Sequence, residues 1–161
     1  MPLFVLTLLA ALGSGVIAGV FFAFSSFVMG ALQRLPAAQG IAAMQSISVV
    51  VLNRSFLGVF VGTAVACAVL GFIALLRWEA PGASLRLLGA LAYLIGCFGV
   101  TMAFNVPRND ALEALKPETA EAAAYWARYL VEWTRWNTVR TLAAFVAATV
   151  LTLSLVQRTE G

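Results

Sequence analysis

The stretch VFVGTAVACAVLGFIALL, residues Val59–Leu76, decides the fold class of this chain. It contains no charged residue. As a helix rising about 1.5 Å per residue it would reach about 27 Å, close to the roughly 30 Å of hydrocarbon in a bilayer. Three other apolar runs of comparable length are Leu3–Met29, Leu87–Phe104 and Thr141–Val156. The four runs predict transmembrane helices over about 3–29, 55–76, 85–104 and 137–156.

The overall composition supports a membrane protein. Of the 161 residues, 62% are hydrophobic and 11% are charged, and the mean hydropathy is +0.96. Soluble domains carry about a quarter charged residues. A chain of this length cannot bury so much apolar surface inside itself, whereas a bilayer accepts it. We therefore expect one all-α domain over 1–161, an integral membrane four-helix bundle.

Charge and residue usage exclude several functions. The ten Lys and Arg residues are scattered singly, and a net charge of +3 without a basic cluster argues against nucleic acid as a partner. The chain has no histidine, which removes the commonest metal ligand and the usual general base, so we expect no metal site. Cys67 and Cys97 both lie in apolar runs, and we interpret them as small hydrophobic residues.

Small residues and prolines shape the bundle. The Gly-x-x-x-Gly pairs Gly15–Gly19 and Gly58–Gly62 let helices approach closely. We interpret them as packing within the bundle, although the same spacing also suits a homo-oligomer.

Pro107 lacks a backbone donor and disfavours helix before it, which predicts that the third helix ends there. Pro117 suits a first helical position, so an interfacial helical segment over about 109–135 should precede the fourth span and continue into it.

Two stretches carry polar residues at the ends of spans. In Asn105-Val-Pro-Arg-Asn-Asp110, the side chains either cap a helix that stops at the membrane surface or form a donor cluster at the mouth of the bundle. The residues alone favour neither reading. The second stretch contains Trp133, Trp136, Asn137 and Arg140, with a helical step between them. An aromatic belt explains the tryptophans, but Asn137 and Arg140 at the edge of an apolar span indicate a site that faces the bundle interior.

Two further stretches complete the candidate site. Gln45 and Asn53 precede the second span, where capping of helix ends is the alternative role. Phe24 and Ser25 lie late in the first span, where packing is the alternative. Because successive spans alternate in direction, all four stretches lie toward the same membrane face. Together they predict a pocket with apolar walls and a few convergent donors.

Taken in order, these stretches resemble the anthrone-oxygenase-like family of small membrane proteins, many of whose bacterial members are known only as a domain of unknown function. The matching residues are Gly19–Ser25, Ala43–Gln45, Asn53 with Phe56, Asn105–Leu112 and Trp136–Thr141. The resemblance runs from about Gly13 to Val156, and the Asn-x-Pro-x-Asn and Trp-Asn-x-x-Arg patterns are its most specific parts. Ser48 stands where an Asn is often found in the family.

The resemblance implies a protein of the bacterial inner (plasma) membrane that oxidises an activated ring methylene with molecular oxygen and no cofactor. Its substrate would be a small lipophilic molecule resembling an anthrone or a phenol. Such chemistry needs a base and donors that stabilise an enolate. The implied catalytic residues are Arg140, Asn137, Asp110 and Asn109, with Glu113 and Glu132 as further candidates for the base. The implied substrate-binding residues are Asn105, Trp133, Trp136, Gln45, Asn53, Phe24 and Ser25.

Other functions remain open. A non-catalytic accessory protein that binds or transports a lipophilic ligand or a lipid would need the same pocket. Four-span membrane glutathione transferases also place Arg and Asn at helix ends, but their characteristic second-helix pattern is not evident in this chain. Arg140 and the asparagines also fit a purely structural role.

Overall fold

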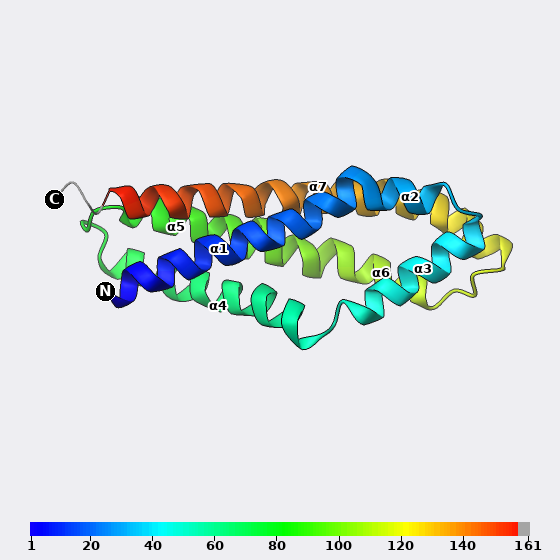
Figure 1. Ribbon diagram of the computed structural model, residues 1–161, viewed down its shortest axis with the longest axis horizontal. Helices are drawn as coiled ribbons and strands as arrows, with labels where there is room; N and C mark the ends of the chain where they lie inside the picture. Colours follow the sequence, from blue (N-terminus) through cyan, green and yellow to red (C-terminus); the bar gives the residue numbers. More distant parts are fainter. Residues whose placement is uncertain (158–161) are drawn as a thin grey trace.

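The computed structural model describes residues 1–157, and within them every regular element is a helix (Figure 1). Four continuous helical spans are long and apolar enough to cross a membrane: Pro2–Gln33, Arg54–Leu76, Ala83–Glu113 and Ala120–Val156. The N-terminus lies at the same end of the molecule as the end of the fourth span, as an even number of spans requires. The prediction of an all-α bundle with four membrane-spanning helices is confirmed.

The spans divide into α-helical and π-helical elements. These are α1 (Pro2–Ala23), η1 (Phe24–Val28), α2 (Met29–Gln33), α3 (Ala37–Val50), α4 (Arg54–Leu76), α5 (Ala83–Leu91), η2 (Ala92–Gly99), η3 (Thr101–Asn105), α6 (Val106–Glu113) and α7 (Ala120–Val156). The first span is therefore α1–η1–α2, and the third is α5–η2–η3–α6. α7 packs along both α1 and α5, and α4 packs along α5 and α1. The segment before the second span forms α3 and lies against α7 and α6.

The third helix does not end at Pro107, contrary to the sequence prediction. It passes through η2 and η3 and continues as α6 to Glu113. Pro107 falls in the first turn of α6, where hydrogen bonding changes from the π-helical to the α-helical register. A wider π-helical turn before a proline accommodates the missing donor and the ring, so the residue marks a register change and not a helix end.

The segment expected over 109–135 divides between two helices. Its first part belongs to α6, and its last part is the beginning of α7, which runs without interruption into the fourth span. α7 begins after Thr119, whose Oγ1 accepts a hydrogen bond from the Ala122 amide at 3.2 Å. A side-chain cap two residues beyond Pro117 therefore sets the start of this helix at Ala120.

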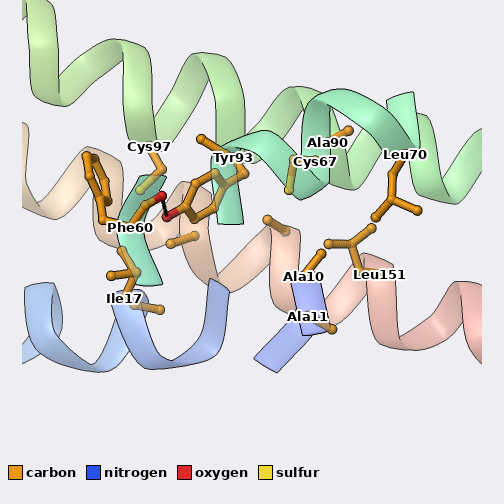
Figure 2. Packing of buried hydrophobic residues seen from close by; sticks show 14 of the residues in the cluster. Ala10, Ala11, Ile17, Phe60, Cys67, Leu70, Ala90, Tyr93, Cys97 and Leu151 are labelled. Atoms are coloured by element: carbon orange, nitrogen blue, oxygen red, sulfur yellow. Dashed lines mark hydrogen bonds between the residues drawn. The ribbon is translucent and has the colours of Figure 1, made fainter. Parts of the chain in front are cut away.

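The bundle has two cores along its length. Figure 2 shows the first, here called the membrane core, where Tyr93 donates a hydrogen bond to the Phe60 carbonyl at 3.1 Å and Cys67 and Cys97 are fully buried. The second, here called the end core, comprises Met29, Leu32, Ile41, Met44, Leu112, Ala122, Trp126, Tyr129 and Trp133. α7 has 37 residues and reaches about 55 Å, well beyond the roughly 30 Å of hydrocarbon. The end core therefore packs the part of the bundle that lies beyond the start of α4.

The glycines divide into packed and open positions. A Cβ built at Gly89 or Gly96 would collide with side chains of α7, so these glycines allow close approach of the third helix. A Cβ at any glycine of the pairs Gly15–Gly19 and Gly58–Gly62 would meet nothing within 4 Å. The interpretation of these two pairs as packing within the bundle is therefore wrong, because their open faces point away from the neighbouring helices.

Candidate functional site

A cavity of about 570 Å³ lies where the membrane core meets the end core. Its wall is mostly apolar and includes Val20, Phe21, Phe24, Met44, Ile47, Phe56, Leu57, Phe60, Phe98 and Val106. The polar side chains that reach it are Ser48, Thr101, Asn109, Asp110, Glu113 and Arg140, together with the indole of Trp133. The cavity has the size and the apolar character of a small-molecule site, and polar groups from α3, η3, α6 and α7 converge on it.

Arg140 is the buried cation of the cavity. It is 6% exposed, and three of its five N–H groups have partners in the protein. Nε and Nη2 donate to Asn137 Oδ1 at 3.0 and 2.8 Å, and Nη1 donates to Thr101 Oγ1 at 3.2 Å. Thr101 can accept this bond because its own hydrogen is donated to the Cys97 carbonyl at 2.8 Å. Among residues 1–157, no acceptor is found for the other two N–H groups of the guanidinium.

Aromatic rings cover the faces of the same guanidinium. Its carbon lies 3.7 Å from the centre of the Phe21 ring and 5.1 Å from the Trp133 ring. These contacts offset part of the cost of removing the cation from water. Within the described part of the chain no carboxylate lies at salt-bridge distance from Arg140, since the ion pair found there joins Arg108 to Glu132. The positive charge of the cavity is therefore held by neutral groups and is not neutralised by the protein.

Asn137 fixes the orientation of Arg140 through a chain of hydrogen bonds. It is fully buried, and its Nδ2 donates to the Phe21 carbonyl and to Ser25 Oγ, both at 2.7 Å. Ser25 is 2.9 Å from Thr138 Oγ1, which itself donates to the Thr134 carbonyl at 3.0 Å. Both amide hydrogens of Asn137 are therefore used, and only its oxygen can face the guanidinium. The Phe21 carbonyl lies just before η1, where the first helix changes register, and it accepts from the Phe24 amide as well as from this side chain of α7.

Asn109 presents an oriented amide to the cavity. Its Oδ1 accepts hydrogen bonds from Tyr129 Oη and Trp133 Nε1, both at 2.8 Å. An indole nitrogen only donates, so the atom that faces Trp133 must be the amide oxygen. The amide nitrogen consequently keeps its two N–H groups for a ligand, with no acceptor found for them among residues 1–157. Asn109 and Arg140 thus bring donors to one cavity from the third helix and from α7.

Two of the three carboxylates considered as a base line the cavity. Asp110 and Glu113 are both exposed residues of α6 on its wall. Glu132 is not on the wall, and its Oε2 accepts hydrogen bonds from Arg108 at 2.9 and 3.1 Å. Asp110 and Glu113 are therefore the carboxylates whose positions suit a base at the open side of the cavity.

Comparison with known proteins now identifies the family. The family model for anthrone oxygenase matches residues 53–150, more than half of the chain. The chain belongs to the anthrone oxygenase family. The match covers α4 to the last two turns of α7 and so includes Thr101, Asn109 and Arg140, whereas Phe21 and Ser25 lie before it. Searches of curated proteins and of solved structures gave no match.

Two amides that the anthrone oxygenase resemblance implied for substrate binding hold helix ends instead of lining the cavity. Gln45 Nε2 donates to the Leu112 and Leu115 carbonyls at the end of α6, both at 2.9 Å. Asn53 is the N-cap of α4, where its Oδ1 accepts from the Phe56 amide at 3.0 Å. Both residues position elements of the cavity wall, but neither is part of that wall.

Asn105 and Trp136 also lie outside the cavity wall. Asn105 is 1% exposed, and its Nδ2 donates to the Trp133 carbonyl at 3.2 Å, while its Oδ1 is buried without a partner within residues 1–157. Trp136 stacks on Phe104 with ring centres 3.6 Å apart. Of the remaining implied binding residues, Phe24 and Trp133 line the cavity. Ser25 is connected to it only through Asn137, which is itself off the wall and contacts Arg140.

Sequence reasoning missed Thr101, which accepts from Arg140, and it did not assign a role to Ser48. Thr101 precedes Asn105 by one helical turn, and a polar residue at that spacing inside an apolar run was the available signal. Ser48 Oγ lies on the cavity wall without a partner among the described residues. In this part of the chain no group of three His, Cys, Asp or Glu side chains could hold a metal ion.

Proposed function

We propose that this protein is a membrane oxygenase that converts an activated ring methylene of a small lipophilic, anthrone- or phenol-like substrate into a carbonyl, using molecular oxygen and no cofactor. The observation that carries the proposal is Arg140, a buried cation with two unused N–H groups, no carboxylate partner and an apolar cavity in front of it. Family membership supports the same chemistry. The proposal places the protein in a bacterial inner membrane.

The first step is removal of a proton from the methylene. Asp110 or Glu113 accepts this proton, because both carboxylates lie on the cavity wall and both are open to water for its release. The negative charge that develops delocalises onto the oxygen conjugated with that carbon, which is the carbonyl oxygen in an anthrone. Hydrogen-bond donors that are already oriented toward that oxygen lower the barrier to proton removal. The free N–H groups of Arg140 and Asn109 are the donors that we assign to this role.

The enolate then reacts with oxygen. It transfers an electron to O₂, the resulting radicals form a C–O bond, and protonation gives a hydroperoxide on the former methylene carbon. Loss of water from that hydroperoxide leaves the carbonyl. The balance is CH₂ + O₂ → C=O + H₂O, in which the methylene carbon is oxidised and one oxygen atom of O₂ is reduced to water. The apolar wall favours both the substrate ring and O₂, and it excludes water from the charged intermediate.

Oxygen uptake by the purified protein tests this proposal. With anthrone as substrate we expect one O₂ consumed per ketone formed, and Arg140→Gln should lower kcat/KM by about 100-fold, as loss of an oxyanion donor does. Arg135→Gln is the matched control, because Arg135 is an exposed arginine of the same helix. Unchanged kcat/KM in folded Arg140→Gln protein would contradict the proposal. A haem or flavin band in the visible spectrum of active protein would contradict its cofactor-free form.

A non-catalytic binder or transporter of lipophilic ligands is the second candidate. The predominance of apolar side chains in the cavity wall favours it, since binding alone needs no base. Saturable binding of anthrone without any oxygen uptake would support this candidate over the oxygenase.

A further inference from the structure

We infer that the cavity takes its ligand sideways from the bilayer, through an opening between the first turns of α4 and the η3–α6 part of the third helix. We further infer that this ligand is an amphiphile with one acidic oxygen, which reaches Arg140. The inference rests on the proposed role of the cavity as a binding site, but it does not depend on catalysis.

The first argument is the depth of the opening in the membrane. Val61 and Met102 both line the cavity, yet they are 43% and 51% exposed, so they lie at its rim. Val61 precedes the end of α4 at Leu76 by fifteen residues, about 22 Å along the helix. Met102 lies at most about 28 Å from the start of α5. Both distances fall within the roughly 30 Å of hydrocarbon, so this rim faces lipid.

The second argument is that the apolar rim continues to the membrane surface. Leu52, in the connection between α3 and α4, lines the cavity and is 66% exposed, and Val49 is 60% exposed. In Figure 1 the beginning of α4 diverges from the third helix while α3 continues along α6. Large apolar side chains around a cavity mouth are stable in contact with acyl chains and costly in water. An apolar path therefore leads from the bilayer to the buried end of the cavity.

The third argument is charge. The water-facing rim carries the exposed carboxylates Asp110 and Glu113, whereas the buried end holds the unneutralised Arg140. An anion arriving from water would be repelled by the rim before reaching the guanidinium. A weak acid dissolved in the bilayer meets no such barrier, and its ionised form is stabilised once it reaches Arg140. The cavity of about 570 Å³ suits a single chain or a small ring system.

A blocking experiment in proteoliposomes tests the route. The variant Val61→Cys is modified with N-cyclohexylmaleimide, and the unmodified variant is its own control. Cys67 and Cys97 are fully buried and should not react. Val65→Cys, treated identically, is the matched control, since Val65 is 58% exposed on the same helix but does not line the cavity. The probe is a fatty acid with a diazirine on its chain, photolysed within seconds of addition, and labelled peptides are identified by mass spectrometry.

We expect the probe to label the peptides of Phe60 and Phe98, and modification of Val61→Cys to lower that labelling about tenfold with no effect in Val65→Cys. The matching diazirine alcohol should label the wild-type cavity about tenfold less than the fatty acid does. The fatty acid should likewise label the cavity of the Arg140→Gln variant about tenfold less than that of the wild type. Equal cavity labelling before and after modification, or equal labelling by acid and alcohol, overturns the inference. If Val61→Cys does not fold, Met102→Cys carries the same test. Absence of oxygen uptake together with the expected labelling would refute the oxygenase and leave this inference standing.

Discussion

The change Asn137→Ala tests whether the buried hydrogen-bond network holds Arg140 in place. Asn137 donates to the Phe21 carbonyl and Ser25 Oγ, both at 2.7 Å, and accepts from the guanidinium at 3.0 and 2.8 Å. A neutral hydrogen bond between membrane helices contributes about 0.6 kcal/mol, and a bond to a charged group about 1.5–3 kcal/mol. Counting the two bonds to the guanidinium as one charged contact, we expect Asn137→Ala to lower the free energy of unfolding by about 3–4 kcal/mol.

A double-mutant cycle separates this explanation from simple loss of packing. Because the cost in Asn137→Ala comes partly from leaving Arg140 without acceptors, replacing the arginine as well should remove that part. The double variant Asn137→Ala/Arg140→Met should therefore be more stable than the sum of the single changes predicts, by about 1.5–3 kcal/mol. Val139→Ala is the control, because Val139 is a neighbouring exposed residue of the same helix and its apolar side chain takes no part in the hydrogen-bond network.

Equilibrium unfolding in mixed micelles of rising SDS content, followed by tryptophan fluorescence, measures all four free energies. The reasoning is refuted if the two single changes add within about 0.5 kcal/mol, the range found for independent sites. It is equally refuted if Asn137→Ala costs no more than Val139→Ala, because a fully buried amide with four hydrogen bonds cannot then be holding the cation.

Three further changes have outcomes set by local geometry. Gly89→Ala places a Cβ 2.7 Å from Leu151 Cγ and should lower stability by about 1–3 kcal/mol in thermal unfolding, whereas Gly15→Ala meets nothing within 4 Å and should be neutral or slightly stabilising. Gln45→Leu removes both side-chain bonds to the end of α6 and should cost about 1–2 kcal/mol while leaving the KM for anthrone unchanged; a raised KM at unchanged stability would contradict this. Asn53→Ala removes the N-cap of α4 and should cost about 1 kcal/mol, most of which Asn53→Asp restores in the same assay.

The fold could be read from the sequence because one physical requirement dominates it. Apolar runs long enough to cross hydrocarbon must become helices, since every backbone group has to be satisfied inside the span. The same reasoning correctly placed Asn137 and Arg140 inside the bundle, where they are 0% and 6% exposed. Polar side chains at membrane depth almost always face the interior of the bundle, because contact with lipid is costly for them.

The details that the sequence did not predict depend on rotation and register. Gln45, Asn53 and Asn109 are all amides near span ends, yet the first two hold helix ends and only Asn109 lines the cavity. An amide is equally suited to a backbone carbonyl and to a ligand, so residue type does not distinguish these roles. The prediction that the third helix ends at Pro107 used the rule for straight α-helices. That rule does not anticipate a π-helical segment such as η3, which lets the helix continue past the proline.

The balance of charge in the cavity makes a ligand anion the simplest explanation of Arg140. Removing a guanidinium from water to this degree costs free energy. The hydrogen bonds to Asn137 and Thr101 and the contact with the Phe21 ring offset only part of that cost. A purely structural arginine would gain more from a carboxylate, and α6 offers one in Asp110 that remains exposed. Keeping the carboxylates at the rim and the cation inside leaves the guanidinium ready for a negative charge that arises on a bound molecule. That separation is what an enolate-forming reaction requires, because acid and base must not neutralise each other before the substrate arrives.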